Sequence, residues 1–262
     1  MERRRALITG AAARLGRAMA LDLAASGWDI ALHYNSSAAE AEATAGELRA
    51  LGARVAPLQA DILDEGAVAG LVGRAKEGLG GPLALLINNA SIFENDTIEN
   101  GTRDSWDRAV ESNLRAPVRL TQDFAAQAPE PRIDARGEPV AQAVVINMID
   151  QRMLKPTPMF MSYTLAKAAL LTFTRTSAQA MAPKVRVGAI GPGPTLAATQ
   201  QSDAHFARQR AACVLGRGSD PEDIVNAMRF ILTNKAFTGQ MLAIDGGQHL
   251  GWETPDVIGT GE

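Results

Sequence analysis

The sequence predicts a single α/β domain of the Rossmann type, built on a doubly wound parallel sheet of about seven strands. Two observations lead to this prediction. Short apolar segments alternate with longer segments of helical periodicity along the whole chain, which is typical of parallel βαβ units with helices on both faces of a sheet. No shift in composition divides the 262 residues into two domains. A chain of this length buries roughly 75% of the surface of its unfolded form, so its core needs no disulfide or metal ion.

The first half of the chain supplies four predicted strands and three predicted helices. The strands are short apolar segments, at residues 6–9, 30–34, 55–61 and 83–91. The helices have apolar residues at helical spacing, at residues 14–27, 38–51 and 65–79. Gly27 suits the left-handed conformation that closes many helices, so it marks the end of the first helix.

The second half continues the alternation with three more strands and three more helices. The predicted helices are residues 103–127, 163–182 and 221–233, and the predicted strands are 144–148, 185–191 and 241–245. Two connections are unusual. Residues 129–139 are rich in proline and charge, which predicts an exposed insertion loop. Residues 194–218 are polar and long for a connection, which predicts a substrate lid.

Charge and composition argue against several classes of partner. The formal charge is −3 and the isoelectric point is about 5.7, so neither nucleic acid nor a membrane surface is expected as a partner. No apolar segment approaches the roughly 18 residues that span a bilayer, and the apolar run after the basic N-terminus is too short for a signal peptide.

Cys213 is the only cysteine, which fits a reducing compartment, and we expect a cytoplasmic protein. His33, His205 and His249 lack metal-ligand spacing, so no metal site is expected.

A glycine-containing turn, residues 9–16, lies between the first predicted strand and the first predicted helix. Its glycines are Gly10 and Gly16, so the spacing differs from the GxGxxG of many dinucleotide sites. Glycine allows backbone amides to approach a pyrophosphate, and the positive end of a helix favours the same anion. The turn predicts a dinucleotide phosphate site, and an ordinary tight turn is the alternative.

The end of the second predicted strand indicates which dinucleotide is preferred. NAD sites commonly place a carboxylate there to bind the ribose hydroxyls. The residues of this chain at that place are His33, Tyr34, Asn35, Ser36 and Ser37. Arg14 and Arg17 add positive charge nearby. The sequence therefore predicts a pocket for the 2′-phosphate of NADP, with a solvated helix face as the alternative role for Arg17.

Tyr163 and Lys167 are four residues apart and share one face of a predicted helix. An ammonium group beside a phenol lowers the pKa of the phenol and prepares it for proton transfer. This spacing alone occurs by chance on many helices. Its position after the fifth predicted strand, together with Asn113 and the segment 88–90, favours a catalytic site.

With these motifs in this order, the chain resembles the short-chain dehydrogenase/reductase family over nearly its whole length, from Thr9 to residues 243–247. The resemblance implies a Rossmann-type sheet, an NAD(P) cofactor and a catalytic tetrad of Asn, Ser, Tyr and Lys. Asn113, Tyr163 and Lys167 match three members of that tetrad. In this arrangement Asn113 is expected to hold a water relay behind Lys167.

The resemblance also implies where the cofactor binds. Asp61 matches the residue that holds the adenine, and Thr195 matches a contact to the nicotinamide carboxamide. Besides residues 33–37, Tyr163 and Lys167, the expected cofactor contacts are Gly10, Arg14, Leu15, Gly16, Asp61, Ile62, Asn89, Ala90, Ser91, Pro192, Gly193 and Thr195.

Two departures from the family pattern resemble its pteridine reductase branch. Arg14 stands at the position of the middle glycine, and Asp150, thirteen residues before Tyr163, stands at the position of the tetrad serine. In that branch a phenylalanine matching Phe93 sandwiches the pterin against the nicotinamide, and residues matching Ser91 and Arg14 contact the pterin and the cofactor phosphate. The expected substrate contacts are therefore Arg14, Ser91, Phe93, Asp150 and Tyr163.

The chemistry of a pterin agrees with a carboxylic acid at position 150. Reduction of a carbon–nitrogen double bond adds hydride to carbon and a proton to nitrogen, and Asp150 can relay that proton. We therefore expect NADPH-dependent reduction of a dihydropterin or dihydrofolate. The first alternative is a carbonyl reductase for a ketone or 3-oxoacyl thioester, which would suit a serine in place of Asp150. The second is a catalytically silent, NADPH-binding regulatory protein.

Other roles for the same residues, and the assembly, are part of the expectation. Asp150 could instead cap a helix, and Phe93 could serve only the packing of a loop. Ser36 departs from the pteridine reductase pattern, because that branch often has an arginine at this position. The apolar residues expected on the wall beside Asp150 are Met153, Leu154, Pro156 and Met159. The resemblance implies a homotetramer built on the helices 103–127 and 163–182, with the tail 248–262 near a subunit contact.

Overall fold

Seven parallel strands form the central sheet of the computed structural model, which describes residues 3–198 and 201–254. Their order is β3-β2-β1-β4-β7-β8-β9. The strands are β1 (Arg4–Ile8), β2 (Trp28–Tyr34), β3 (Val55–Gln59), β4 (Leu85–Asn88), β7 (Ala143–Met148), β8 (Val185–Pro192) and β9 (Met241–Ile244). The strand order reverses between β1 and β4, and ligands of such sheets bind at the carboxyl ends of the strands near this point. The predicted fold class and strand number are confirmed.

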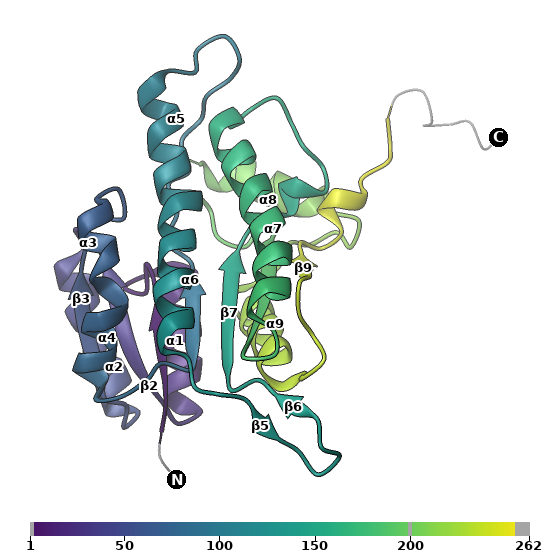
Figure 1. Ribbon diagram of the computed structural model, residues 1–262. Coiled ribbons are helices and arrows are strands. Elements are labelled where there is room, and N and C mark those ends of the chain that lie inside the picture. Colours follow the sequence, from purple (N-terminus) through teal and green to yellow (C-terminus); the bar gives the residue numbers. More distant parts are fainter. Residues whose placement is uncertain (1–2, 199–200, 255–262) are drawn as a thin grey trace.

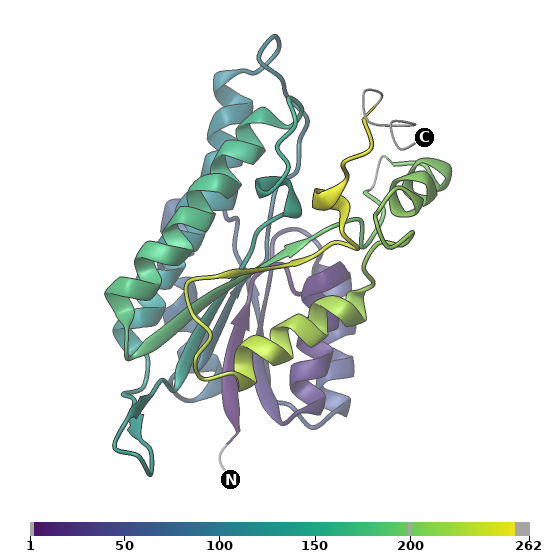
Figure 2. The same cartoon turned by 90° about the vertical axis from the view of Figure 1, so that its right-hand side faces the viewer.

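Helices cover both faces of the sheet and give the molecule three layers (Figures 1 and 2). One face carries α1 (Arg14–Ala25), α2 (Ala38–Ala50) and α9 (Pro221–Thr233). The other face carries α4 (Leu71–Leu79), α6 (Ala116–Gln127) and α7 (Met161–Met181). Each face buries its own apolar cluster, with Met19, Leu23 and Ile224 on the first and Leu71, Leu120 and Phe124 on the second. This burial on both sides explains why the strands are apolar throughout rather than alternating.

Two of the predicted helices are interrupted. The region 65–79 divides at Gly70 into α3 (Glu65–Ala69) and α4, and Asp64 caps α3 by accepting hydrogen bonds from the amides of Gly66 and Ala67 at 2.8 and 3.1 Å. The region 103–127 divides into α5 (Arg103–Val110), the π-helical η1 (Glu111–Arg115) and α6. A π-helical turn within an α-helix often marks a functional position, and Asn113 lies in this one.

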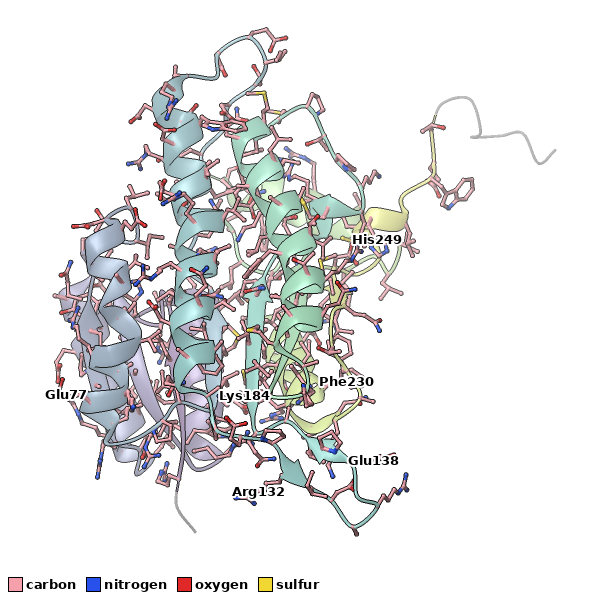
Figure 3. The ribbon with its side chains drawn as sticks, in the orientation of Figure 1. Glu77, Arg132, Glu138, Lys184, Phe230 and His249 are labelled. Atoms are coloured by element: carbon pink, nitrogen blue, oxygen red, sulfur yellow. The ribbon has the colours of Figure 1, made fainter. Side chains whose placement is uncertain are left out.

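The exposed insertion over 129–139 is not a simple loop. It contains a two-stranded antiparallel hairpin of β5 (Arg132–Ile133) and β6 (Pro139–Val140). Asp134 stabilises its turn, since its Oδ1 accepts hydrogen bonds from the amides of Arg136 and Glu138 at 2.8 and 3.1 Å. Figure 3 labels Arg132 and Glu138 on this hairpin, which extends from the amino-terminal end of β7. The hairpin therefore lies at the end of the sheet opposite to the ligand-binding edge.

The segment predicted as a lid contains α8 (Asp203–Ala211). Its C-terminal part is anchored by Arg210, whose guanidinium donates hydrogen bonds to the carbonyls of Pro194 and Ser219 at 3.0 and 2.6 Å. Two of its residues, 199 and 200, lie outside the described residues, as does the tail 255–262 that the subunit expectation included. Movement of this segment as a lid stays a prediction.

Among residues 3–198 and 201–254, the helices are too short or too polar to cross a bilayer. The segment after β9 turns through η3 (Gln248–Leu250), where Figure 3 labels His249. His249 contacts the buried carboxylate of Asp245 at 2.7 Å.

Candidate active site

A cavity of about 720 Å³ opens at the carboxyl ends of the strands, a volume within the usual range for small-molecule sites. It brings together most of the predicted site residues. Those on its wall are Gly10, Arg14, Leu15, His33, Asn35, Asp61, Ile62, Asn89, Ala90, Ser91, Phe93, Asp150, Tyr163, Lys167, Pro192, Gly193 and Thr195. The predicted residues that are not part of the wall are Gly16, Tyr34, Ser36, Ser37 and Asn113.

The turn after β1 presents its backbone to this cavity. Gly10 has a φ of +63°, and a Cβ at this position would lie 3.2 Å from the Ala90 Cα and 3.2 Å from the Asn89 Nδ2. Asn89 closes the approach by donating hydrogen bonds to the carbonyls of Thr9 and Gly10 at 2.8 and 3.2 Å. Gly16 has a packing role, because its Cβ would lie 2.2 Å from the Gly10 carbonyl oxygen. The tight turn and the adjoining N-terminus of α1 suit the phosphates of a dinucleotide.

Arg14 occupies a conformation that glycine adopts more easily. Its φ is +52°, in the left-handed region where a side chain is strained. Its Nη2 donates a hydrogen bond to the Leu196 carbonyl at 3.2 Å. The side chain therefore links the phosphate turn to the segment after β8, which a glycine could not do.

The role expected for His33 as a phosphate donor is not supported. His33 is 1% exposed, its Nδ1 accepts a hydrogen bond from the Gly10 amide at 3.1 Å, and its Nε2 bonds to the Ala60 carbonyl at 3.0 Å. Burial lowers the pKa of His33. Both ring nitrogens are therefore committed in a neutral ring that supports the glycine turn.

Asn35 is the polar side chain after β2 that reaches the cavity wall, whereas Ser36 and Ser37 are exposed outside it. Arg17 forms a surface ion pair with Glu47 on α2, which agrees with its alternative role on a solvated helix face. The absence of a carboxylate at the end of β2, with Arg14 nearby, remains the argument for a 2′-phosphate.

The turn after β8 forms another part of the cavity wall. At Gly193, a Cβ would lie 2.5 Å from the Asp245 Cβ, so only glycine allows this turn to pack on the segment after β9. The Thr195 hydroxyl is buried against the Ser219 hydroxyl at 2.5 Å and donates to the Gly193 carbonyl at 3.1 Å. These contacts fix Pro192 and Thr195 at the carboxyl end of β8.

Asp150, Tyr163 and Lys167 converge on one side of the cavity. The Tyr163 hydroxyl donates a hydrogen bond to Asp150 Oδ2 at 3.0 Å, and Asp150 Oδ1 accepts one from the Arg152 amide at 2.7 Å. The Lys167 ammonium is buried, donates to the Met148 carbonyl at 2.7 Å and lies 5.6 Å from the centroid of the Tyr163 ring. Asp150 also caps η2 (Gln151–Met153). The structure thus shows the alternative capping role, and a catalytic role stays a prediction.

Burial dominates the electrostatics of this group. It raises the pKa of Asp150 and lowers the pKa of Lys167 to about 8. It also raises the pKa of Tyr163 well above its ordinary value, and the charge of Asp150 acts in the same direction. The net pKa of Tyr163 is therefore raised in this arrangement, and the expected lowering by Lys167 stays a prediction. The environment favours protonated forms of both Asp150 and Tyr163.

Asn113 supports the segment after β4. Its Oδ1 accepts a hydrogen bond from the Ser91 hydroxyl at 2.6 Å, and its Nδ2 donates to the carbonyls of Ile92 and Ala109 at 2.9 and 3.1 Å. It is completely buried. The expected water relay to Lys167 stays a prediction, since the Asn113 contacts in the described residues lead to this segment and its own helix.

An aromatic cluster lies next to Tyr163, and the sequence predicted only one of its other members, Phe93. Phe93 is 44% exposed and stacks on Phe160 with ring centroids 4.1 Å apart and planes 6° apart. The edge contact between Phe93 and Tyr163 has a centroid distance of 4.8 Å. The guanidinium of Arg152 lies 4.9 Å from the Phe160 centroid. Sequence reasoning missed Phe160 and Arg152. Phe160 lies before the predicted helix 163–182, so helical spacing gave no signal for it.

A second group missed in the sequence holds the N-terminus of α7. Phe160, at the N-cap position, has a φ of +58° and provides no side-chain cap. Instead, Asn95 Oδ1 accepts a hydrogen bond from the Phe160 amide at 3.2 Å, and Asp96 accepts from the amides of Met161 and Ser162, both at 3.0 Å. We call Asn95 and Asp96 the α7 clasp. It ties the segment that carries Phe93 to the helix that carries Tyr163.

The residues predicted to form an apolar wall beside Asp150 do not line the cavity. These four residues are Met153, Leu154, Pro156 and Met159. The residues on the cavity wall that the sequence did not single out include Gln151, Arg152, Gln201, Gln209 and Gln248, with Phe206 from α8.

Comparison with known proteins shows similarity over nearly the whole chain. Residues 10–249 match a protein-family model described as enoyl-(acyl carrier protein) reductase. Pteridine reductase 1 of Leishmania tarentolae is 30% identical over 283 residues, covering 94% of this chain and 96% of that protein. The 3-oxoacyl-[acyl-carrier-protein] reductase FabG of Staphylococcus aureus is 27% identical over 250 residues, covering 94% of this chain and 98% of FabG.

Solved structures show the same similarity over nearly the whole chain. The crystal structure of FolM alternative dihydrofolate reductase 1 from Brucella suis, in complex with NADP, has a TM-score of 0.89 and 42% sequence identity. The match covers 97% of this chain and 98% of that chain. A blue fluorescent protein from a metagenomic library, in complex with NADPH, has a TM-score of 0.84 and 29% identity, with 94% and 97% coverage.

Proposed function

The chain belongs to the short-chain dehydrogenase/reductase family, and we propose that it reduces a dihydropterin or dihydrofolate with NADPH. The observation that carries the proposal is the hydrogen bond between Tyr163 and the half-buried carboxyl of Asp150. Asp150 stands where the family pattern has a serine, and its raised pKa suits a proton donor. The similarity to FolM alternative dihydrofolate reductase 1 and to pteridine reductase 1 supports the same substrate class.

The cavity wall fits a phosphorylated dinucleotide. The Gly10 turn offers close backbone approach and α1 has no acidic residue in its first turn, so an anion is favoured there. We assign the phosphates to this turn, the 2′-phosphate to the side of Arg14 and Asn35, and the adenine to the side of Asp61. When bound, NADPH supplies a hydride to the substrate.

The protein's part in the reaction is to deliver a proton. Reduction of the pterin carbon–nitrogen double bond places the hydride on carbon and leaves the nitrogen in need of a proton. Asp150 and Tyr163 share a hydrogen bond in a buried place where their neutral forms are favoured, so either can hold that proton ready. Lys167, fixed on the Met148 carbonyl, supplies the positive charge that offsets the resulting carboxylate.

Phe93 is the proposed stacking partner of the pterin ring. One face of Phe93 lies on Phe160, while 44% of its surface is exposed. A flat heterocycle gains roughly 0.5–1.5 kcal/mol from offset stacking in addition to the burial of its surface. Ser91, held by Asn113, offers a hydroxyl beside the ring.

Reduction of a ketone or 3-oxoacyl thioester is the second candidate, favoured by the similarity to FabG. A ketone oxygen becomes an alkoxide, for which the family pattern has a neutral serine hydroxyl, and position 150 of this chain holds an acid instead. Asp150 therefore argues for the pterin. A silent regulatory role is opposed by Tyr163 and Lys167, both of which reach the cavity wall.

Location and assembly are part of the proposal. A single buried cysteine, Cys213, supports a reducing compartment such as the cytoplasm. The whole chain is proposed to be one domain. A homotetramer would use the outer surfaces of α7 and of the continuous helix formed by α5, η1 and α6, which lie side by side on one face of the sheet (Figure 1). Size-exclusion chromatography with light scattering measures this state directly.

The proposed function is tested by following NADPH oxidation with three substrates. Turnover with dihydrobiopterin or dihydrofolate, and little with an acetoacetyl thioester, is the expected result. The reverse preference would assign the chain to carbonyl reduction. Binding of NADPH without turnover of any of the three would favour the regulatory role.

A further inference from the structure

We propose that Arg152 binds a carboxylate on the tail of the substrate, so that the enzyme prefers a folate, with its acidic tail, over a pterin with an uncharged side chain. This inference rests on the proposed function and assigns a residue that the family pattern left without a role. Its starting point is the distribution of cations around the cavity. The cationic side chains on its wall are Arg14, Arg108, Arg152 and Lys167.

Three of these four cations are already engaged. Arg108 forms an ion pair with Glu94 at 2.8 Å, Lys167 is bound to the Met148 carbonyl, and Arg14 reaches the Leu196 carbonyl. Arg152 and Arg14 both lack an ion pair within residues 3–198 and 201–254, but Arg14 is the proposed partner of the 2′-phosphate, whereas Arg152 has no part in the proposed cofactor site. The guanidinium of Arg152 makes a single hydrogen bond in the described residues, from Nη1 to the Thr157 hydroxyl at 2.5 Å.

The orientation of Arg152 leaves one edge of the guanidinium uncommitted. The group lies over the rings of Phe160 and Phe93, 4.9 and 6.0 Å from their centroids. Its Nε is buried and lacks a hydrogen-bond partner among the described residues. The edge formed by Nε and Nη2 is the one that pairs with a carboxylate through two parallel hydrogen bonds. An acceptor that arrives with a substrate would satisfy this buried donor.

The surroundings match a flat ring followed by an anion. Phe93 is the proposed partner of the pterin, and Arg152 contacts the same aromatic pair. The Asp150 carboxylate, two residues before Arg152, accepts hydrogen bonds from the Arg152 amide and the Tyr163 hydroxyl. It does not pair with the Arg152 guanidinium. The Phe93 and Phe160 rings also hold the guanidinium in place, which reduces the entropy lost on binding. A folate carries an aromatic linker and carboxylates beyond its pterin, whereas dihydrobiopterin carries none.

The test compares dihydrofolate with dihydrobiopterin in the wild type, Arg152→Gln and Arg152→Lys. In Arg152→Gln the KM for dihydrofolate should rise about 10- to 100-fold, with little change in kcat and in the KM for NADPH. The KM for dihydrobiopterin should change less than about threefold. Arg152→Lys keeps the charge without the planar group, so it should recover only part of the loss.

Two other effects of the substitution are separable from this one. Removal of Arg152 raises the pKa of Asp150, because its charge lowers that pKa in the wild type, and it also weakens the aromatic cluster. Both effects act on the two substrates equally. Arg108→Gln is the matched control, since Arg108 lies on the same wall but is paired with Glu94. It should not change the ratio of kcat/KM between the two substrates.

Binding of p-aminobenzoylglutamate, which needs no turnover, gives a second readout by calorimetry. The wild type should bind it in a salt-dependent manner, and Arg152→Gln should bind at least about tenfold more weakly. Equal loss for both substrates, an effect on NADPH binding, or unchanged binding of the fragment would overturn the inference while leaving pterin reduction intact. If the wild type reduces neither pterin, the proposed function fails, and the fragment titration alone decides the role of Arg152.

Discussion

The Tyr163 hydroxyl donates its hydrogen bond to Oδ2 of Asp150 at a distance of 3.0 Å, which joins the first turn of α7 to the end of β7. Both side chains line the cavity, and burial raises the pKa of each. In the proposed function, this pair holds the proton that passes to the substrate nitrogen. The predictions below follow from this pair and the residues that position it.

Tyr163→Phe removes the hydroxyl that Asp150 accepts from. We expect kcat to fall by about 10²–10⁴-fold, the usual range for loss of a positioned proton donor. Lys167→Met should also remove most of the turnover, because it deletes the buried charge near both groups. Circular dichroism should show that both variants keep the fold. Thr172→Val, on the exposed side of the same helix, is a control, and near-normal rates in Tyr163→Phe would refute the assigned role.

Asn35→Asp places a carboxylate on the cavity wall just after β2, where NAD-dependent enzymes of this fold commonly have one. The added charge should repel a 2′-phosphate and move the preference from NADPH toward NADH. We expect the ratio of kcat/KM for NADPH to NADH to fall by at least about tenfold, since two negative charges in close contact cost several kcal/mol. Ser36→Asp should act in the same direction but less strongly, because Ser36 does not line the cavity. Comparable efficiency of the wild type with both cofactors would contradict the assignment.

Phe93→Ala removes the exposed ring proposed to stack on the pterin. The KM for dihydrobiopterin should rise by about 2- to 13-fold from the loss of stacking alone, and more from the loss of buried surface. The Kd for NADPH, measured by fluorescence titration, should change little. Phe230, a half-exposed aromatic residue of α9 far from the cavity, provides a control through Phe230→Ala. Equal weakening of pterin and NADPH binding would show that Phe93 serves the fold rather than the substrate.

Asp96→Ala removes the carboxylate of the α7 clasp. Burial alone would raise the pKa of Asp96, but hydrogen bonds from Ser162 and Ser105 outweigh it and lower the pKa in the folded state. The stabilisation by this carboxylate is therefore complete above its ordinary pKa of 3.8 and is lost as the pH falls through the lower folded value.

At neutral pH, urea denaturation should show a loss of about 2–3 kcal/mol in the free energy of unfolding of Asp96→Ala, the cost of breaking hydrogen bonds to a buried charged group. The difference from the wild type should shrink below about pH 4. Asp104→Ala, at an exposed position of α5, should cost far less. A loss for Asp96→Ala that does not change with pH would show that the charge of Asp96 is unimportant.

The sequence predicted the fold well because its signals are local. Buried parallel strands are continuous apolar runs, and the helices between them keep their period, so strand number and helix positions were readable. The interruptions of two helices could not be predicted from the sequence. The break at Gly70 and the π-helical turn around Asn113 depend on how each helix packs against its neighbours. Residues 132–140 form a hairpin because Asp134 organises the turn, whereas their composition indicates only exposure.

The sequence predicted that Asp150 and Tyr163 lie together, because their residue types and spacing carry the signal. It did not predict contacts between distant segments. Asp96 binds Ser162 across 66 residues, and Phe160 and Arg152 acquire their roles by stacking. Burial raises the pKa of Tyr163, and burial is a property of the folded chain that the spacing of Tyr163 and Lys167 does not reveal.

The most direct test of the central claim is the rate of NADPH oxidation by the wild type and Asp150→Ser with dihydrobiopterin and with an acetoacetyl thioester, measured against pH. The wild type should reduce the pterin, with kcat/KM falling as the pH rises through the raised pKa of Asp150, because only the protonated acid donates. Asp150→Ser should lose about 10²–10⁴-fold of this activity, lose that pH dependence and gain weak reduction of the thioester. Full pterin activity in Asp150→Ser, or no pterin reduction by the wild type, would contradict the account.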